Sequence, residues 1–136
     1  MSVPVNQRNT GKLEVCLKAH DLCVYTLRIT SNEKTFSPTY AAFTQRIAET
    51  AIEIHTKVWS ANNVMVKTRE EYALRHSLQE ESAVACNMLL SYIEIAHSLY
   101  HLSTKRVKYW ADMIINTRAL IRAWRDSDAK RYAEYR

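Results

Sequence analysis

The sequence contains very little glycine and proline: one glycine and two prolines in 136 residues. Turns between β-strands draw heavily on these two residues, so a sheet protein with many tight turns is excluded. A single glycine, Gly11, also excludes most glycine-rich phosphate loops, dinucleotide-binding turns and nucleophile elbows. The composition therefore predicts a few long helices joined by short polar connections.

Cysteine is also scarce, with three residues that lack the spacing of a ligand set: Cys16, Cys23 and Cys86. An odd number of cysteines without a CxxC or Cys/His pattern argues against a disulfide framework and against a structural zinc site. We expect the three cysteines to be buried, to behave as small hydrophobic residues, and to stay reduced because the protein lies in a reducing compartment.

Long hydrophobic runs are missing as well. The most apolar stretch, residues 83–100, is interrupted by Asn87, Glu94 and His97, which makes it a poor membrane span. The first residues show no apolar region of a signal peptide. We therefore predict a cytoplasmic protein with no membrane partner.

Apolar residues recur at three- and four-residue steps, the period of amphipathic helices. Four helices are expected, over about residues 12–29, 37–62, 68–100 and 103–125. Ser37 before Pro38, Thr68 before Glu71, and Ser103 provide the start signals of the last three helices. The fold prediction is an all-α, antiparallel, up-down-up-down four-helix bundle.

The expected domain plan has three parts. A flexible arm covers residues 1–10, the bundle covers residues 11–127, and a basic tail covers residues 128–136. Within the bundle, residues 83–100 are apolar on nearly all sides of the helix. Such a helix is buried on more than one face, which predicts a subunit interface, or alternatively a central helix of the bundle.

The net charge of +5 lies entirely in residues 101–136. Residues 1–100 carry ten Lys/Arg and ten Asp/Glu, whereas residues 101–136 carry nine basic and four acidic side chains. A charge confined to one terminal element suggests a surface that meets polyanions. The alternative is a solvated helix face followed by a basic end.

A helical wheel of the last helix separates its core positions from its cations. The core arc is Val107, Trp110, Ile114, Thr117, Leu120, Ile121 and Trp124. The predicted nucleic-acid-binding or partner-binding residues are Lys105, Arg106, Lys108, Arg118, Arg122 and Arg125. The three arginines form a stripe at the edge of the core arc. Lys105 and Arg106 lie in the first turn, where cations oppose the helix dipole, so helix stability does not explain them.

Aromatic side chains accompany these cations. We expect Tyr109, Tyr132 and Tyr135 to be exposed, and exposed aromatics beside basic residues suit stacking on single-stranded bases.

Catalytic and metal-binding patterns are weak. Glu94 and His97 match one Glu-x-x-His element of di-metal bundles, but a second element is missing, and His97 with His101 gives two ligands at most. We therefore predict no enzyme, no metal and no cofactor. A lower alternative is a HEPN-like ribonuclease, because Arg69 and His76 fit the loose Arg/His spacing of that family and share one helix face.

The chain resembles a family of four-helix bundles that includes the 23S rRNA intervening-sequence proteins and the accessory variability determinants of diversity-generating retroelements. The resemblance covers most of the chain and is carried by the long third helix and four segments: VNQRNT at 5–10, VWSANN at 58–63, STKRVKYW at 103–110 and RALIRAWRDSD at 118–128.

The resemblance implies a non-enzymatic function. Accessory determinants form a basic homopentamer that binds a reverse transcriptase and its template RNA or cDNA and supports mutagenic reverse transcription. By resemblance, this chain would use the basic residues of its last helix in that way. The alternative within the family is a protein–protein interaction bundle of the intervening-sequence type. The chain departs from the family in that its first three helices are neutral.

Overall fold

The computed structural model describes the backbone of residues 5–136 and the side chains of residues 14–136. Four long helices, with bounds α1 Val5–Thr30, α2 Ala41–Asn62, α3 Arg69–Leu99 and α4 Thr104–Arg131, make up nearly all of it. Two short 3-10 turns, η1 (Pro38–Tyr40) and η2 (Ala133–Tyr135), precede α2 and follow α4.

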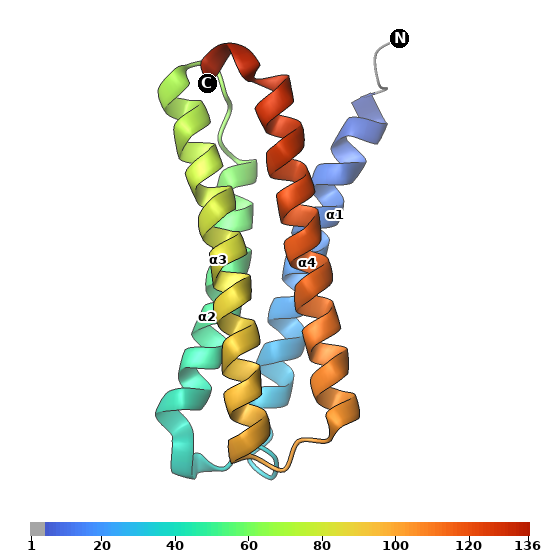
Figure 1. The fold of residues 1–136 in the computed structure, drawn as a ribbon, viewed down its shortest axis with the longest axis vertical. Helices are drawn as coiled ribbons and strands as arrows, with labels where there is room; N and C mark the ends of the chain where they lie inside the picture. Colours follow the sequence, from blue (N-terminus) through green and yellow to red (C-terminus); the bar gives the residue numbers. More distant parts are fainter. Residues whose placement is uncertain (1–4) are drawn as a thin grey trace.

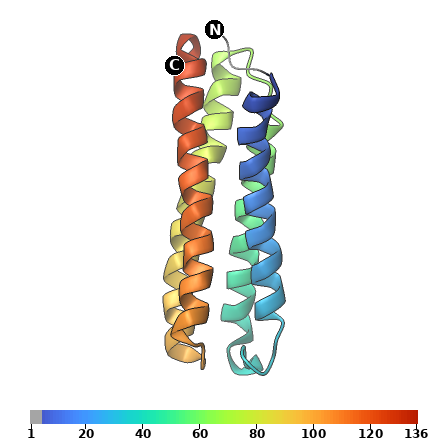
Figure 2. The same ribbon diagram turned by 90° about the vertical axis from the view of Figure 1, so that its right-hand side faces the viewer.

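The helices run up-down-up-down along one common axis, as Figures 1 and 2 show. Each helix packs against its neighbours in chain order, and α4 closes the bundle against α1. The predicted all-α four-helix bundle is therefore confirmed. We call the end that carries residues 31–37 and 100–103 the lower end, and the end that carries residues 63–68 the upper end (Figure 1). In the described part of the chain, no helix is long and apolar enough to cross a membrane.

Local capping sets where the helices begin. The Thr68 hydroxyl accepts a hydrogen bond from the Glu71 backbone N–H at 3.2 Å, and the Glu71 carboxylate accepts one from the Lys67 N–H at 2.9 Å. The Ser103 hydroxyl accepts from the Arg106 N–H at 3.1 Å. These caps satisfy backbone donors that have no partner within the helix. The predicted starts of α3 and α4 are thus confirmed, while Ser37 caps η1 rather than α2 itself.

The first and the last helix both extend beyond the predicted bounds of the bundle. Helix α1 begins at Val5 rather than near Lys12, so residues 5–10 are helical and do not form an extended arm; residues 1–4 lie outside the described residues. Helix α4 continues to Arg131, and Asp128, which the sequence assigns to the tail, is a buried residue of the bundle at 2 % exposure. The bundle therefore includes the start of the predicted tail.

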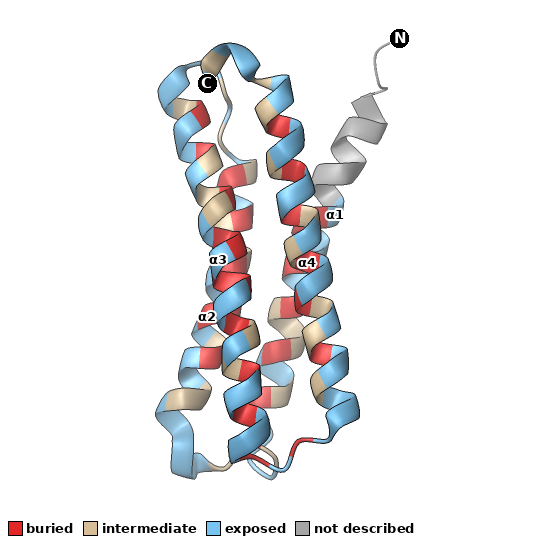
Figure 3. Cartoon of the chain, viewed as in Figure 1, coloured by how far each residue is buried: buried red, intermediate tan, exposed pale blue. Residues whose placement is uncertain are grey.

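Buried residues, coloured red in Figure 3, lie on the inward faces of all four helices. At the lower end they form an aromatic group: the Phe36 ring lies 4.8 Å from the Tyr100 ring and 6.2 Å from the Trp110 ring, measured between centroids. The fully buried Trp110 donates its indole N–H to the Thr26 hydroxyl at 3.1 Å. This hydrogen bond fixes α4 to α1, because a buried indole N–H needs a partner.

The upper end is held by a buried ion pair instead. Arg75 of α3 donates to both carboxylate oxygens of Asp128 on α4, at 2.6 and 3.1 Å, and the Gln79 amide donates to the same carboxylate at 2.7 Å. The Arg75 guanidinium also lies 5.0 Å from the Trp124 ring centroid. All four residues are buried. The pair therefore stays intact because each charge is compensated within the core.

Candidate nucleic-acid interface

The six predicted cations all lie on α4, but they differ in exposure. Lys105, Arg106, Lys108 and Arg122 are exposed, whereas Arg118 and Arg125 are half-buried. Of the predicted core arc, Val107 and Leu120 are half-buried and the other five residues are buried. The wheel therefore places the core face of α4 correctly, while the predicted arginine stripe divides into exposed and half-buried members.

Arg118 and Arg125 reach across to α3. The Arg118 guanidinium donates to the Asn87 side-chain oxygen at 2.7 Å, and the Arg125 guanidinium donates to the Glu80 carboxylate at 2.7 Å. Arg125 also pairs with Asp126 at 3.1 Å, and the hydrogen bond to Glu80 raises the pKa of Arg125. Two of the three stripe arginines are thus engaged within the chain, but only Arg125 has its charge compensated, because Asn87 is neutral.

Lys108 is paired in a weaker way. Its ammonium lies 3.0 Å from the Asp112 carboxylate one turn along α4, with the two side chains 74 % and 54 % exposed. Exposed pairs at this spacing contribute about 0.3–0.5 kcal/mol, so a phosphate can displace the carboxylate at little cost.

Lys105 and Arg106 have no carboxylate within ion-pair distance among residues 14–136. Together with Tyr25, Ser103 and Tyr109 they line an open hollow of about 310 Å³ at the lower end. Arg106 also borders a second hollow of about 250 Å³ that reaches His101. Among these residues, Lys105 and Arg106 are therefore uncompensated and exposed, as are Arg122, Lys130 and Arg131 further along α4. The first turn differs from those positions because its cations border a hollow with an exposed aromatic ring.

Tyr25 of α1 and Tyr109 of α4 form the aromatic wall of the first hollow. Their ring centroids lie 5.2 Å apart with the planes tilted by 59°. Tyr109 is 58 % exposed, as predicted, whereas Tyr132 and Tyr135 are half-buried. Burial raises the pKa of Tyr25, and the nearby Arg106 charge partly offsets that rise. The lower end thus combines two cations with an exposed aromatic face.

Arg122 lies over the α3–α4 seam near Cys86. Burial raises the pKa of the Cys86 thiol to about 12, although the charges of Arg118 and Arg122 act in the opposite direction. Burial also raises the pKa of Cys16 and Cys23. All three thiols therefore stay protonated near neutral pH, which makes them poor nucleophiles and poor metal ligands.

The metal candidates do not form a site in the part of the chain with described side chains. No group of three or more His, Cys, Asp or Glu side chains comes within metal-binding reach there. Glu94, His97 and His101 are exposed at the lower half of the molecule.

The ribonuclease candidates Arg69 and His76 do come together. Both line an open hollow of about 480 Å³ at the upper end, with Tyr72, Tyr135 and Arg136 around it. The His76 ring stacks on Tyr72 at a centroid distance of 5.7 Å. Its Nδ1 atom is buried and has no hydrogen-bond partner among the described residues. Two arginines, Arg69 and Arg136, and one histidine per chain share this hollow.

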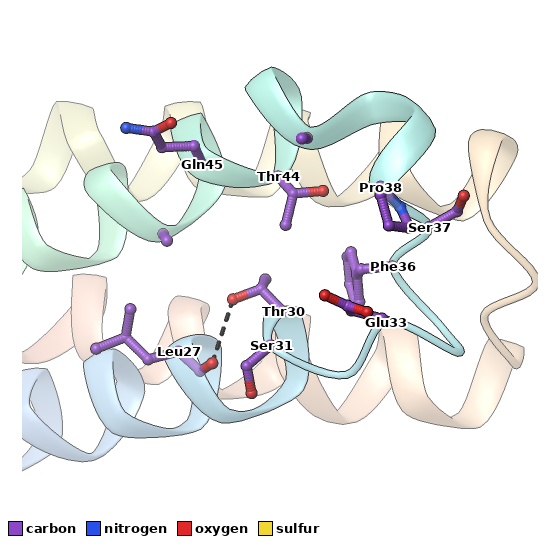
Figure 4. Close-up of a pocket in the computed structure, with 11 residues that line it drawn as sticks. Leu27, Thr30, Ser31, Glu33, Phe36, Ser37, Pro38, Thr44 and Gln45 are labelled. Atoms are coloured by element: carbon purple, nitrogen blue, oxygen red, sulfur yellow. Dashed lines mark hydrogen bonds between the residues drawn. The ribbon is translucent and has the colours of Figure 1, made fainter.

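A further hollow of about 500 Å³ lies between the end of α1 and the start of α2 (Figure 4). Its walls are neutral polar and apolar side chains together with Glu33. The Thr30 hydroxyl on its floor is occupied, because it donates to the Thr26 and Leu27 carbonyls at 2.7 and 3.3 Å. Without a cation, this hollow offers a polyanion no favourable contact.

The outward face of α3 is apolar along its second half. Val84, Met88, Ile95 and Leu99 are 54 %, 44 %, 44 % and 40 % exposed, and their spacing places them opposite the buried face of the helix. We call these four residues the α3 outer stripe. A row of exposed apolar side chains of this kind is typical of an association surface.

The sequence did not predict two residues of structural importance: Tyr25, which lines the hollow beside Lys105 and Arg106, and Asp128, which forms the buried ion pair. Tyr25 was not predicted because its contact with Tyr109 joins positions far apart in the chain. Asp128 was not predicted because its partner Arg75 is 53 residues away. In both cases the local pattern carries no signal of the contact. The six predicted residues are spread along α4: Lys105, Arg106 and Lys108 lie in its first two turns, and Arg118, Arg122 and Arg125 lie in its second half.

Comparison with known proteins finds no matching family model, no matching curated protein and no matching solved structure.

Proposed function

We propose that this protein is an accessory nucleic-acid-binding scaffold of a diversity-generating retroelement. It would bind the reverse transcriptase and the template RNA or cDNA through the basic residues of α4 and carry out no chemistry itself. The observation that carries the proposal is the pair Lys105 and Arg106, two exposed cations without a carboxylate partner among the described residues, beside the exposed Tyr109. Uncompensated cations of this kind release counterions from a nucleic-acid backbone when they bind it.

Self-association would strengthen nucleic-acid binding, because it would bring the basic residues of several chains together. We propose a homopentamer assembled through the α3 outer stripe, whose exposed apolar side chains gain from burial. Five chains of net charge +5 would carry a total of about +25, enough to steer polyanions over several Ångström. We place this assembly in the cytoplasm, where the three free thiols stay reduced.

The proposal is tested by binding of a labelled single-stranded RNA across a salt series, with the mass of the binding species measured by light scattering. The wild-type chain should lose affinity steeply as salt rises. The double variant Lys105→Glu/Arg106→Glu should weaken binding and reduce the slope of log affinity against log salt by about 1.4 for each engaged subunit, because two contacts of about 0.7 are lost.

The matched control is Lys18→Glu/Lys67→Glu, two exposed cations outside α4. It changes the net charge by the same amount, so it isolates position from total charge. Equal losses in the two double variants would show that net charge, and not the N-terminal turn of α4, governs binding. No binding by the wild-type chain at low salt would reject the proposal and favour the alternative of a protein–protein interaction bundle.

The ribonuclease alternative has one specific observation in its favour, since Arg69 and His76 border the same hollow. It predicts that the labelled RNA is shortened without added metal and that His76→Ala stops the shortening. RNA recovered at full length from the wild-type samples would remove this alternative.

A further inference from the structure

We call the hollow lined by Tyr25, Ser103, Lys105, Arg106 and Tyr109 the lower hollow. It has two features that a simple phosphate-binding patch does not need. It has a half-buried aromatic wall, Tyr25, and an exposed aromatic face, Tyr109, within 5.2 Å of each other. The two cations Lys105 and Arg106 border the same space of about 310 Å³. We infer that this hollow binds an unpaired nucleotide, with its base stacked on Tyr109 and its phosphate on Lys105 and Arg106. This inference rests on the proposed function and specifies its substrate class as single-stranded nucleic acid.

Tyr25 is held in place from behind. Its ring lies 6.2 Å from the Trp110 ring at an angle of 71°, and Trp110 is fully buried and hydrogen-bonded to Thr26. Tyr25 therefore forms a fixed side of the hollow. Tyr109 projects from α4, which packs beside α1, and has more than half of its surface in solvent. A base can reach that ring without displacing any part of the core.

The charges lie where the phosphate of a stacked nucleotide would be. Lys105 and Arg106 precede Tyr109 by four and three residues, the spacing at which side chains on a helix are neighbours. The Arg106 charge is close enough to Tyr25 to lower the pKa of its phenol against the effect of burial. The nearest acid on this part of α4, Asp112, is paired with Lys108. The cations and the rings thus act on the same small space.

This geometry discriminates between strands and duplexes. Bases in a duplex are stacked on one another and expose only their edges, so Tyr109 cannot stack on them. An unpaired base has a free π-face, and stacking on an aromatic side chain is tolerant of base identity. The phosphate contacts serve both forms. The hollow therefore adds a preference for single strands to an otherwise general affinity.

The test compares binding of a 20-nucleotide oligo-uridine, a 20-nucleotide oligo-thymidine and a 20-base-pair duplex by fluorescence anisotropy at low salt. The variant Tyr109→Leu keeps an apolar side chain and removes the ring. It should weaken binding of both single strands by about ten-fold and leave duplex binding unchanged. Tyr109→Phe should retain single-strand binding, and the control Trp59→Leu, at an exposed aromatic residue of α2, should bind like the wild type.

A second measurement does not depend on variants. Photo-crosslinking of a 5-bromouridine oligonucleotide should modify Tyr109 or Tyr25, as located by mass spectrometry. Unchanged single-strand binding by Tyr109→Leu, with the loss in Lys105→Glu/Arg106→Glu intact, would overturn this inference and leave the proposed function standing. If the wild-type chain binds neither strand nor duplex, the proposed function itself fails.

Discussion

Both halves of α4 carry cations, yet the structure uses them differently. In the upper half, Arg125 pairs with Glu80, Arg118 donates a hydrogen bond to Asn87, and the buried Arg75 of α3 pairs with Asp128. At the lower end, Lys105 and Arg106 have no such partner among the described residues and border an open hollow. Positive charge therefore links α4 to α3 in the upper half, where Arg122, Lys130 and Arg131 stay unpaired among the described residues. In the first turn, both cations are unpaired among those residues and border a hollow with an aromatic wall.

This difference shows that a charge count locates an interface only after the internal partners are known. Arg118 and Arg125 are as basic as Lys105 and Arg106 in the sequence, but their nearest partners lie on α3. The helix dipole adds to the contrast, because Lys130 and Arg131 in the last turn of α4 are favourably placed and the cations in its first turn are not.

The largest effect is expected at the buried ion pair of the upper end. Asp128→Ala leaves Arg75 buried without its counter-charge and takes an acceptor from Gln79. We expect the free energy of unfolding to fall by about 3–5 kcal/mol, measured by urea denaturation. The control Asp126→Ala, at an exposed acid two residues away, should change it by less than about 1 kcal/mol. Similar losses in the two variants would contradict the role assigned to the pair.

A smaller effect follows from Cys86, which lies buried under the arginines of α4. Its folded-state pKa is raised from 9.0 to about 12, so the folded protein holds the proton more tightly than the unfolded chain. The stabilisation is fully present below pH 9 and is lost as the pH rises toward 12, by up to about 1.4 kcal/mol for each pH unit. Comparing urea denaturation of wild type and Cys86→Ala between pH 8 and 10 isolates this contribution. Parallel pH profiles for the two proteins would contradict it.

The smallest effect is expected when cations of α4 are replaced: the free energy of unfolding should rise for a replacement in the first turn and fall for one in the upper half. Replacing Lys105 and Arg106 by Glu puts acids into the first turn of α4 and should stabilise the protein by about 1 kcal/mol while weakening RNA binding. Arg125→Ala at the other end removes the contact with Glu80 and should cost about 0.5 kcal/mol. Thermal denaturation checks both signs. A loss of stability in Lys105→Glu/Arg106→Glu would mean that these cations have a structural role.

The sequence predicted the features that depend on neighbouring residues. The caps at Thr68 and Ser103 and the buried positions of Trp110 and Trp124 follow from local spacing, and all four are confirmed. The start of α1 before Lys12 was missed, because nothing in the polar residues there marks a helix start.

Features that depend on distant partners were out of reach. Arg75 and Asp128 both look like surface residues in the sequence, and only the fold brings them together in the core. The same holds for the Tyr25 wall of the lower hollow. A helical wheel reports which way a side chain leaves its own helix, and it carries no information about which residue of another helix it meets.

The positions of the tryptophans allow the two ends of the bundle to be compared by intrinsic fluorescence. Trp110 is enclosed at the lower end and hydrogen-bonded to Thr26, Trp124 lies against the Arg75 guanidinium at the upper end, and Trp59 is half in solvent on α2. Each end therefore holds its own intrinsic fluorophore in a distinct environment. With Trp59 replaced, the emission of single-tryptophan variants would report separately on loosening at either end of the same bundle.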